Sequence, residues 1–413
     1  MDRGPVRTVR LAAEYDAFLF DLDGVVHRGD DVIPGAPETV AALRDAGRTV
    51  VFITNNSART PDRIAERLTG MGIRASSDEV VTSALATAAL LRREGDEGAR
   101  SAFVVGEEGI RAALSAVGIE VLDGTASRAD YVIVGWDRGA DYDALRTATV
   151  LVGRGARLVA TNGDASYPAP SGELWPGAGA LLAAVETASG VRATVVGKPH
   201  RPLFDAALER AGTRRALVVG DRIETDVAGA EGAGLDGALV LTGAAVPADL
   251  LTHQAQPRFV LPDVRGLLEE RPAASVRPAT DDDAAGVRAL LETAGLGPHD
   301  GDLWEEPVST VVAGDGDLVA TAAIEVRAEN AYLRAVAVAE AARGYGLGMQ
   351  IVGAAAGAAR HRGASRVWLF TETAWGFFGR LGFETVVREA LPPWIAGMSH
   401  DCPITMGRSI AGT

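Results

Sequence analysis

Residues 17–24 read AFLFDLDG, four apolar residues followed at once by two aspartates and a glycine. Side chains two positions apart in an extended chain point to the same side, so Asp21 and Asp23 are predicted to face one way. Gly24 allows a sharp turn behind them. Comparable apolar runs of strand length, separated by Ala-rich helical stretches, recur at 49–54, 131–135, 157–161 and 215–221. This alternation predicts parallel βαβ units and an α/β fold whose sheet is covered on both faces.

The size and composition of the chain favour a folded protein of several domains. Its 413 residues suffice for two or three domains of roughly 100–200 residues each. Hydrophobic residues make up 47% and charged residues 23%, as in globular proteins. The formal net charge of −15 argues against nucleic acid or anionic membranes as partners, because their phosphates would be repelled.

The cysteine content and the apolar runs favour a cytoplasmic protein. Cys402 is the only cysteine, so we expect neither an intrachain disulfide nor a thiolate zinc site. Residues 1–16 lack the long apolar run of a signal peptide. No segment approaches the roughly 18 uninterrupted apolar residues of a membrane span. The sequence leaves homo-oligomerisation open.

The Asp21-Leu22-Asp23-Gly24 pattern suits phosphoryl transfer. Phosphate ester hydrolysis can be split into two displacements if one carboxylate attacks phosphorus and its neighbour protonates the leaving alkoxide. Two carboxylates beside an anionic substrate require a cation, and magnesium prefers such oxygen ligands. By itself the pattern is weak, since a calcium-type acidic loop or a solvated turn has the same sequence.

Polar side chains near the ends of the other expected strands strengthen this hypothesis. They are Thr54, Asn55, Asn56, Lys198, Asp221 and Asp226. Each has an ordinary alternative: a strand-end cap, a surface charge, or an acidic helix start. All of them lie near the carboxyl ends of expected parallel strands, the edge at which open α/β sheets bind ligands. Their coincidence predicts a phosphoryl-transfer site.

The order of four motifs resembles that of the haloacid dehalogenase superfamily. The motifs are DLDGVV (21–26), TNN (54–56), GKP (197–199) and GDRIETD (220–226). Within the superfamily the spacing resembles the NagD-like phosphatases, which include phosphoglycolate, glycerol-phosphate and 4-nitrophenyl phosphate phosphatases. The resemblance covers roughly residues 14–265. It implies a Rossmann-like core with an inserted α/β cap of the C2 type.

The resemblance also implies roles for the carboxylates. Asp21 would be the nucleophile that forms an aspartyl-phosphate, and Asp23 the general acid and then base. Asp221 would bind Mg²⁺ together with the carboxylate of Asp21 and the backbone carbonyl of Asp23. Asp226 would support the metal site directly or through water.

The remaining motif residues would bind the substrate. Thr54 would hold the phosphoryl group, and Lys198 would neutralise its charge and orient Asp21. Asn55 and Asn56 are further candidates for binding the substrate. His27 and Arg28 follow the first motif and could touch a substrate, but we expect them at the surface.

The long stretch between Thr54 and Lys198 leaves room for the cap. In it, ATNGDASYP (160–168) resembles the cap loop that faces the catalytic centre of this family. Asn162 and Asp164 are therefore candidates for contacting the leaving group, although turn formation explains an Asn-Gly-Asp run equally well. The expected boundaries are 1–83 and 186–268 for the core, 84–185 for the cap, 269–276 for a linker and 277–413 for a C-terminal domain.

The C-terminal part resembles a GNAT acetyltransferase. Residues 343–348, RGYGLG, match the Arg-x-x-Gly-x-Gly loop between a strand and a helix, where backbone amides can bind a pyrophosphate. The resemblance implies acetyl-CoA binding by Arg343, Gly344, Gly346 and Gly348. FFGRLGF (377–383) fits the same fold, and the tail with Cys402 resembles amino-acid N-acetyltransferases.

The chemistry of this C-terminal domain is unassigned. Many GNAT enzymes carry a tyrosine, which protonates the departing thiolate, where this chain has Phe378. Glu325 is a candidate base, but an exposed strand glutamate is the simpler interpretation.

Three functional hypotheses follow. The first is a phosphatase for glycerol 3-phosphate or 2-phosphoglycolate, with nucleotide or sugar-phosphate hydrolysis as its rival. The second adds amino-group acetyl transfer. The third makes the GNAT-like domain an acetyl-CoA sensor or a scaffold.

Overall fold

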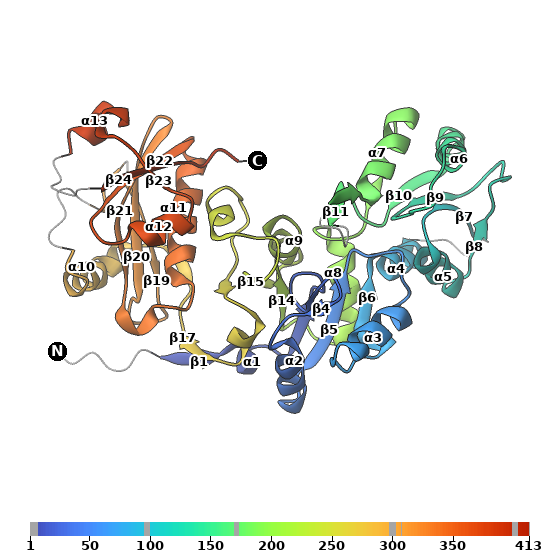
Figure 1. Ribbon diagram of the computed structural model, residues 1–413, viewed down its shortest axis with the longest axis horizontal. Helices are drawn as coiled ribbons and strands as arrows, with labels where there is room; N and C mark the ends of the chain where they lie inside the picture. The colour runs from blue at the N-terminus through green and yellow to red at the C-terminus, as the bar shows by residue number, and fades with distance from the viewer. Residues whose placement is uncertain are drawn as a thin grey trace. The chain divides into compact units, whose positions relative to one another are not determined.

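The computed structural model describes residues 7–94, 100–168, 173–296, 303–306, 308–398 and 404–412. Its contacts divide the chain into two compact units. One unit holds Tyr15–Gly220 and Ala228–Asp236, and the other holds Met1–Glu14, Asp221–Val227 and Gly237–Thr413. Figure 1 labels most of the helices and strands used below.

The central sheet has six strands in the order β16-β15-β14-β2-β5-β6. They are β2 (Ala17–Phe20), β5 (Thr49–Thr54), β6 (Val80–Thr82), β14 (Ala216–Gly220), β15 (Asp236–Val240) and β16 (Phe259–Leu261). β2 pairs in parallel with β5 on one side and with β14 on the other. Every residue of β2 and β14 is buried, which explains why these strands are continuous apolar runs.

Helices accompany the strands of this sheet. They are α1 (Leu11–Glu14), α2 (Ala36–Asp45), α3 (Pro61–Gly70), α4 (Ser83–Glu94), α8 (Arg201–Ala211) and α9 (Ala228–Ala233). α3 begins at Pro61 after an extended Thr60, as expected for a first-turn proline. A short hairpin, β3 (His27–Arg28) with β4 (Asp31–Val32), follows the first motif.

The residues inserted between β6 and β14 form a second parallel sheet, in the order β13-β10-β9-β7-β8. Its strands are β7 (Arg100–Val105), β8 (Ile119–Leu122), β9 (Tyr131–Val134), β10 (Arg157–Ala160) and β13 (Thr194–Val195). Helices α5 (Glu108–Ala116), α6 (Tyr142–Gly153) and α7 (Ala178–Ser189) belong to the same region, with a hairpin of β11 (Ser166–Pro168) and β12 (Leu174–Pro176). This is the inserted α/β cap.

The C-terminal domain is built on a seven-stranded mixed sheet in the order β18-β19-β20-β21-β22-β24-β23. Its strands are β18 (Val276–Pro278), β19 (Val308–Ala313), β20 (Ala320–Arg327), β21 (Asn330–Val338), β22 (Arg366–Thr371), β23 (Glu384–Thr385) and β24 (Ile404–Ser409). Its helices are α10 (Ala284–Thr293), α11 (Leu347–His361), α12 (Trp375–Arg380) and α13 (Pro393–Ala396). α11 begins before Gly348 rather than after it, because the chain leaves the loop at Gly346 with a φ of 80°. The expected order of a Rossmann-like core followed by a GNAT α+β domain is confirmed.

The stretch expected to be a linker contains a strand. β17 (Glu270–Pro272) pairs antiparallel with β1 (Thr8–Arg10). Arg10 and Glu270 form an ion pair of 2.9 Å across this ribbon. Hydrogen bonding from the N-terminal segment thus gives residues 270–272 a regular structure that their own composition did not indicate.

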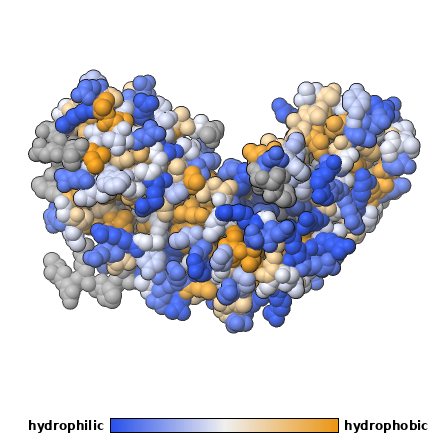
Figure 2. Space-filling model, viewed as in Figure 1, coloured by the Kyte–Doolittle hydropathy of each residue, from blue (hydrophilic) through white to orange (hydrophobic). Residues whose placement is uncertain are grey.

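The face of the molecule seen in Figure 2 is largely polar. Hydrophilic residues cover much of the face in Figure 2, with apolar residues in smaller patches between them, as expected for a net charge of −15. Within the described residues, every helix is too short or too polar to cross a membrane.

Candidate active site

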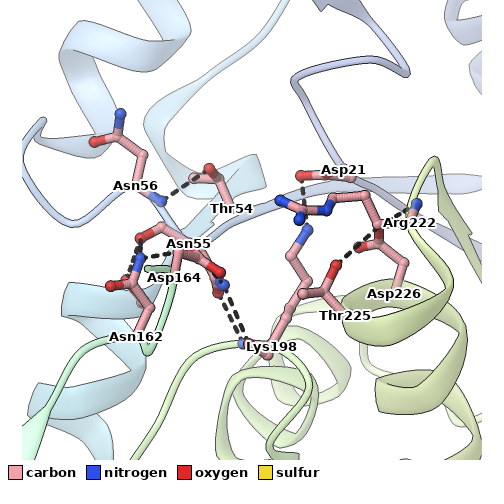
Figure 3. Close-up of polar contacts among 11 residues, drawn as sticks. Asp21, Thr54, Asn55, Asn56, Asn162, Asp164, Lys198, Arg222, Thr225 and Asp226 are labelled. Carbon is pink, nitrogen blue, oxygen red and sulfur yellow. Dashed lines mark hydrogen bonds and ion pairs between the residues drawn. The ribbon is translucent and has the colours of Figure 1, made fainter. Parts of the chain in front are cut away.

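Asp21 and Lys198 form a buried ion pair. Asp21 directly follows β2, and its backbone amide donates to the Val219 carbonyl of β14 at 2.8 Å. Lys198 Nζ lies 2.7 Å from Asp21 Oδ1, and the two side chains are 3% and 12% exposed. Figure 3 shows this pair at the centre of the site. Because charges this deeply buried are costly unless paired, the ammonium group holds the carboxylate in one orientation.

Asp23 is placed by the turn that follows. Gly24 takes a φ of 85° and its amide donates to the His27 carbonyl at 2.7 Å. His27 Nδ1 lies 3.2 Å from Asp23 Oδ1. Desolvation raises the pKa of Asp23, but the interactions with His27 and the positive charges of Arg67 and Lys198 outweigh it, so the pKa lies below its ordinary value.

His27 is buried, at 3% exposed, where we expected a surface residue. The reason is the alternation of side chains along β3: His27 points inward while the next residue, Arg28, is exposed. A two-residue strand is too short to be recognised from its sequence, so the burial of this neighbour of Asp23 was not predicted.

Thr54 and Asn56 order the loop after β5. Thr54 is the last residue of the strand and is buried, and its Oγ1 accepts a hydrogen bond from the Asn56 amide at 3.1 Å. Asn56 Oδ1 in turn accepts from the amides of Ala58 and Arg59, at 3.1 and 3.3 Å. The Asn56 side chain therefore shapes its own loop in a local turn.

Asn55 joins the core loop to the cap loop. Its Nδ2 donates to Asp164 Oδ2 at 3.0 Å and to the Lys198 carbonyl at 3.1 Å, while its Oδ1 accepts from the Lys198 amide at 2.8 Å. Asn162 Nδ2 donates to the Asn55 carbonyl at 2.8 Å and to Asp164 Oδ2 at 3.0 Å. Figure 3 shows the three side chains pointing toward one another. The network connects Lys198 to the cap through Asn55.

Asp221 directly follows β14, Asp226 lies in the short π-helix Ile223–Val227, and both are almost fully buried. Asp221 Oδ2 accepts a hydrogen bond from the Ala244 amide at 2.6 Å. Asp226 Oδ2 accepts from the Arg222 amide at 3.1 Å and from Thr225 Oγ1 at 3.4 Å. Backbone amides thus hold one oxygen of each carboxylate.

The GNAT-like loop has the expected glycine conformations. Gly344 and Gly346 have φ values of 87° and 80°, which favour glycine. Arg343 Nε donates to the Val338 carbonyl at 3.2 Å, and buried Arg271 donates to the Tyr345 carbonyl at 2.8 Å. Beside the loop lies a cleft of about 260 Å³, lined by Val260, Leu261, Pro262, Gly266, Glu269, Arg271, Arg343, Gly344 and Tyr345.

The two other C-terminal candidates are buried. Glu325 was expected at the surface, but only 4% of it is exposed. It forms ion pairs with Arg327 at 2.6 Å and with Arg334 at 3.7 Å. Phe378 packs edge-on against Phe383. Cys402 lies outside the described residues.

Family models match three parts of the chain. Residues 18–120 match the haloacid dehalogenase-like hydrolases, residues 195–267 a second HAD-hydrolase-like model, and residues 290–383 the GNAT acetyltransferase family. An acid sugar phosphatase of Staphylococcus saprophyticus is 36% identical over 258 residues, which are 62% of this chain and 98% of that protein. The chain belongs to the haloacid dehalogenase-like hydrolases.

Other proteins similar to this hydrolase are also phosphatases. The D-glycerol 3-phosphate phosphatase of Mycobacterium tuberculosis is 36% identical over 270 residues, 65% of this chain and 75% of that protein. A crystal structure of glycerol phosphate phosphatase from the same organism, in complex with magnesium, has a TM-score of 0.69 and 29% identity, covering 91% of this chain and 99% of that chain. A 5′-nucleotidase of Bacillus subtilis is 36% identical over 231 residues, 55% of this chain and 88% of that protein. The chain is a phosphoric monoester hydrolase.

The carboxylates of the hydrolase suit a divalent cation. β14 and β2 pair in register at Val219 and Phe20, so Asp21 and Asp221 leave neighbouring strands at one sheet edge. In the described part of the chain, Asp21, Asp221 and Asp226 each offer one oxygen, and these atoms lie within 4.8 Å of one another. Three carboxylate oxygens form a hard donor set that fits magnesium or calcium.

Proposed function

We propose that this chain is a magnesium-dependent phosphatase that hydrolyses a small phosphate monoester through an aspartyl-phosphate. The observation that supports it most is the buried Lys198–Asp21 pair of 2.7 Å, in which Asp21 leaves β2 at the same sheet edge at which Asp221 leaves β14. A lysine that neutralises a nucleophilic carboxylate also neutralises the phosphate that approaches it. Bound magnesium, held by Asp21, Asp221, Asp226 and the Asp23 carbonyl, would polarise the phosphoryl group.

In the first step a carboxylate oxygen of Asp21 attacks phosphorus, and the bond from phosphorus to the alcohol oxygen breaks. Asp23 gives its proton to that oxygen, so the alcohol leaves neutral. The pKa of Asp23 is lowered in the free protein, and the approach of a phosphate dianion opposes that shift because like charges disfavour ionisation. Substrate binding thus helps to protonate the acid that the first step needs.

In the second step the Asp23 carboxylate takes a proton from water as the water attacks the phosphorus of the aspartyl-phosphate. The bond from phosphorus to Asp21 breaks, which restores the nucleophile and releases phosphate. The lowered pKa of Asp23 favours the ionised carboxylate in this role. Thr54, buried at the end of β5, would hold phosphoryl oxygens in both steps.

Glycerol 3-phosphate or 2-phosphoglycolate is the favoured substrate class. The support is the glycerol phosphate phosphatase of M. tuberculosis, whose structure matches 91% of this chain. The cap, built on the sheet β13-β10-β9-β7-β8, would limit substrate size when it closes. The alternatives are sugar phosphates and nucleotides. The similarity to the acid sugar phosphatase supports the first, and the similarity to the 5′-nucleotidase supports the second.

Initial rates of phosphate release with magnesium, over a panel of glycerol 3-phosphate, 2-phosphoglycolate, hexose phosphates and nucleoside monophosphates, test the proposal. We expect the three-carbon and two-carbon esters to have the highest kcat/KM. A marked preference for a nucleoside monophosphate would contradict the substrate class, and no hydrolysis of any ester would contradict the function.

We do not include acetyl transfer in the proposed function. Phe378 has no proton to donate, and Glu325 is held by two arginines. Acetyl-CoA binding at Arg343, Gly344, Gly346 and Gly348 stays a prediction, favoured by the positive φ values of Gly344 and Gly346. Calorimetry with acetyl-CoA on the full chain tests it, and heat without turnover of any amine would favour a sensor.

A further inference from the structure

The carboxylate of Asp221 is held by a loop from elsewhere in the chain. The Ala244 amide donates to Asp221 Oδ2 at 2.6 Å, and the Ala245 amide donates to the Asp221 carbonyl at 3.0 Å. Gly243 lies so close that a Cβ there would overlap Oδ2. Residues 241–246 therefore set the position of one oxygen of this candidate metal ligand.

That loop leads into a rigid segment. The Val246 amide donates to Asp249 Oδ2 at 2.9 Å, at the start of the 3₁₀ helix η3 (Pro247–Leu251). Gln256 Nε2 donates to the carbonyls of Leu250 and His253, at 3.0 and 3.1 Å. We call residues 241–253 the Asp221 loop. The Val246–Asp249 hydrogen bond thus ties η3 to the residue that follows Ala244 and Ala245, whose amides hold Asp221.

The C-terminal domain holds the far end of the Asp221 loop. From α11, Arg360 donates to the carbonyls of Leu251 and His253, and from β24, Arg408 donates to the Ala248 carbonyl at 3.1 Å. Gly353 of α11 lies against Leu250, whose Cβ would be 3.2 Å from a Cβ on the glycine. All these residues belong to one compact unit. The carbonyls of η3 thus depend on two arginines of the C-terminal domain.

The two arginines are partly buried rather than fully exposed. Burial lowers the pKa of Arg360, and burial lowers that of Arg408 against the opposing charges of Asp249 and Glu384. A partly buried guanidinium group that loses its acceptors is costly, so these contacts hold both sides together. Gln350, also on α11, adds hydrogen bonds to the carbonyls of Pro257 and Arg258, at 3.2 and 2.6 Å.

We infer that the C-terminal domain positions the magnesium ligand Asp221, through Arg360 and Arg408 acting on the Asp221 loop. The domain then serves the phosphatase site whether or not it binds acetyl-CoA. The inference rests on the proposed function because it needs magnesium at Asp221. Arg360 and Arg408 are positioning residues, since they contact neither the metal ligands nor the expected place of the substrate.

The test compares Arg360→Leu with Arg362→Leu in the full chain. Arg362 follows the same helix but pairs with Glu306 and Ser309 of its own domain, so it controls for general loss of stability. Magnesium binding by the metal-free proteins is measured by calorimetry. Removing an outer partner of a metal ligand typically weakens binding about 10–100-fold, and we expect the low end, roughly 10-fold, for Arg360→Leu. Arg362→Leu should stay within about 2-fold of the wild type.

Hydrogen exchange supplies a second readout that needs no magnesium. Amides of residues 241–253 should exchange about 10-fold faster in Arg360→Leu than in Arg362→Leu. If Arg360→Leu does not fold, Arg408→Leu takes its place in both measurements.

The outcomes separate the inference from the proposed function. Equal magnesium affinity and equal exchange in the wild type and Arg360→Leu overturn the inference alone, as does an equal loss in Arg362→Leu. A wild-type chain that binds no magnesium overturns both. A loss confined to Arg360→Leu or Arg408→Leu supports the inference.

Discussion

Two loops of this chain carry motifs for phosphate groups, and they differ in what surrounds them. At the hydrolase loop, Lys198 comes from far along the chain to lie 2.7 Å from Asp21 in a buried pair. At the GNAT-like loop, Arg343 donates to the chain's own Val338 carbonyl, and a Cβ on Gly346 would overlap the Val260 backbone. A motif predicts chemistry best where reactive side chains from distant segments converge, and that convergence is present at the first loop.

The largest effect is expected from removing the nucleophile of the hydrolase loop. Asp21→Asn keeps the shape of the side chain but removes the nucleophile, so phosphate release should fall by about 10⁴-fold or more. Steady-state rates with magnesium measure the loss, and circular dichroism checks the fold. Turnover near the wild-type rate would show that Asp21 is not the nucleophile.

Lys198→Met tests the partner of the nucleophile. Without the ammonium group nothing at this position neutralises the phosphoryl charge, so kcat should fall by about 10²–10³-fold. The variant should also unfold more easily, because it leaves a buried carboxylate without its cation. Lys198→Arg, which keeps the charge, is the matched control. Equal loss in both variants would indicate that the geometry of lysine matters more than its charge.

The sequence predicted those parts of the structure whose signals are local. Continuous apolar runs predicted β2 and β14, and the polar residues after them predicted that Asp21 and Asp221 would leave one sheet edge. Lys198 instead follows β13 of the second sheet, so its 2.7 Å contact with Asp21 is a tertiary feature. His27 was named but expected at the surface, because its burial depends on a two-residue strand. Glu325 was expected at the surface, yet β20 is buried along nearly its whole length.

The contacts that hold Asp221 could not be predicted from the sequence. They join its carboxylate to the Ala244 backbone, and Ala244 has no distinguishing side chain. In the sequence Arg360 looks like any arginine in the last turn of a helix, where the helix dipole favours a basic residue. Only tertiary placement shows that it donates to carbonyls of the Asp221 loop.

A smaller effect is expected from breaking the hydrogen bonds that join the hydrolase loop to the cap. Asp164→Ala removes the acceptor that Asn55 and Asn162 share, and Asn55 in turn bonds the backbone of Lys198. We expect kcat/KM to fall by about 10-fold. Asp123→Ala is the control, since Asp123 is a cap aspartate that accepts from Thr125 in its own turn. An unchanged kcat/KM in Asp164→Ala would exclude a role for this network in catalysis.

In the C-terminal domain, breaking the Arg277–Asp283 ion pair should affect stability and not catalysis. Asp283 accepts two hydrogen bonds from Arg277, at 2.6 and 2.7 Å, and the Arg277 guanidinium holds the pKa of this carboxyl well below its usual range. The pair therefore contributes stability above the ordinary aspartate pKa of about 4, and this contribution is lost as the pH falls below it. Asp283→Asn should lower the Tm by about 2–4 °C at pH 7 and by less at pH 3, measured by calorimetry. A difference that does not shrink in acid would contradict the ion pair as its cause.

The smallest expected effect completes the comparison. Arg343→Ala removes the one charged side chain of the GNAT-like loop, which contacts Val338 and none of the residues that hold Asp221. Phosphatase rates and magnesium affinity should both stay within about 2-fold of the wild type. The same variant in acetyl-CoA calorimetry reports on the loop itself, because a lost binding heat would assign Arg343 to that ligand. A large drop in phosphatase activity would instead show that the GNAT-like loop affects the hydrolase loop. The two loops would then not act independently.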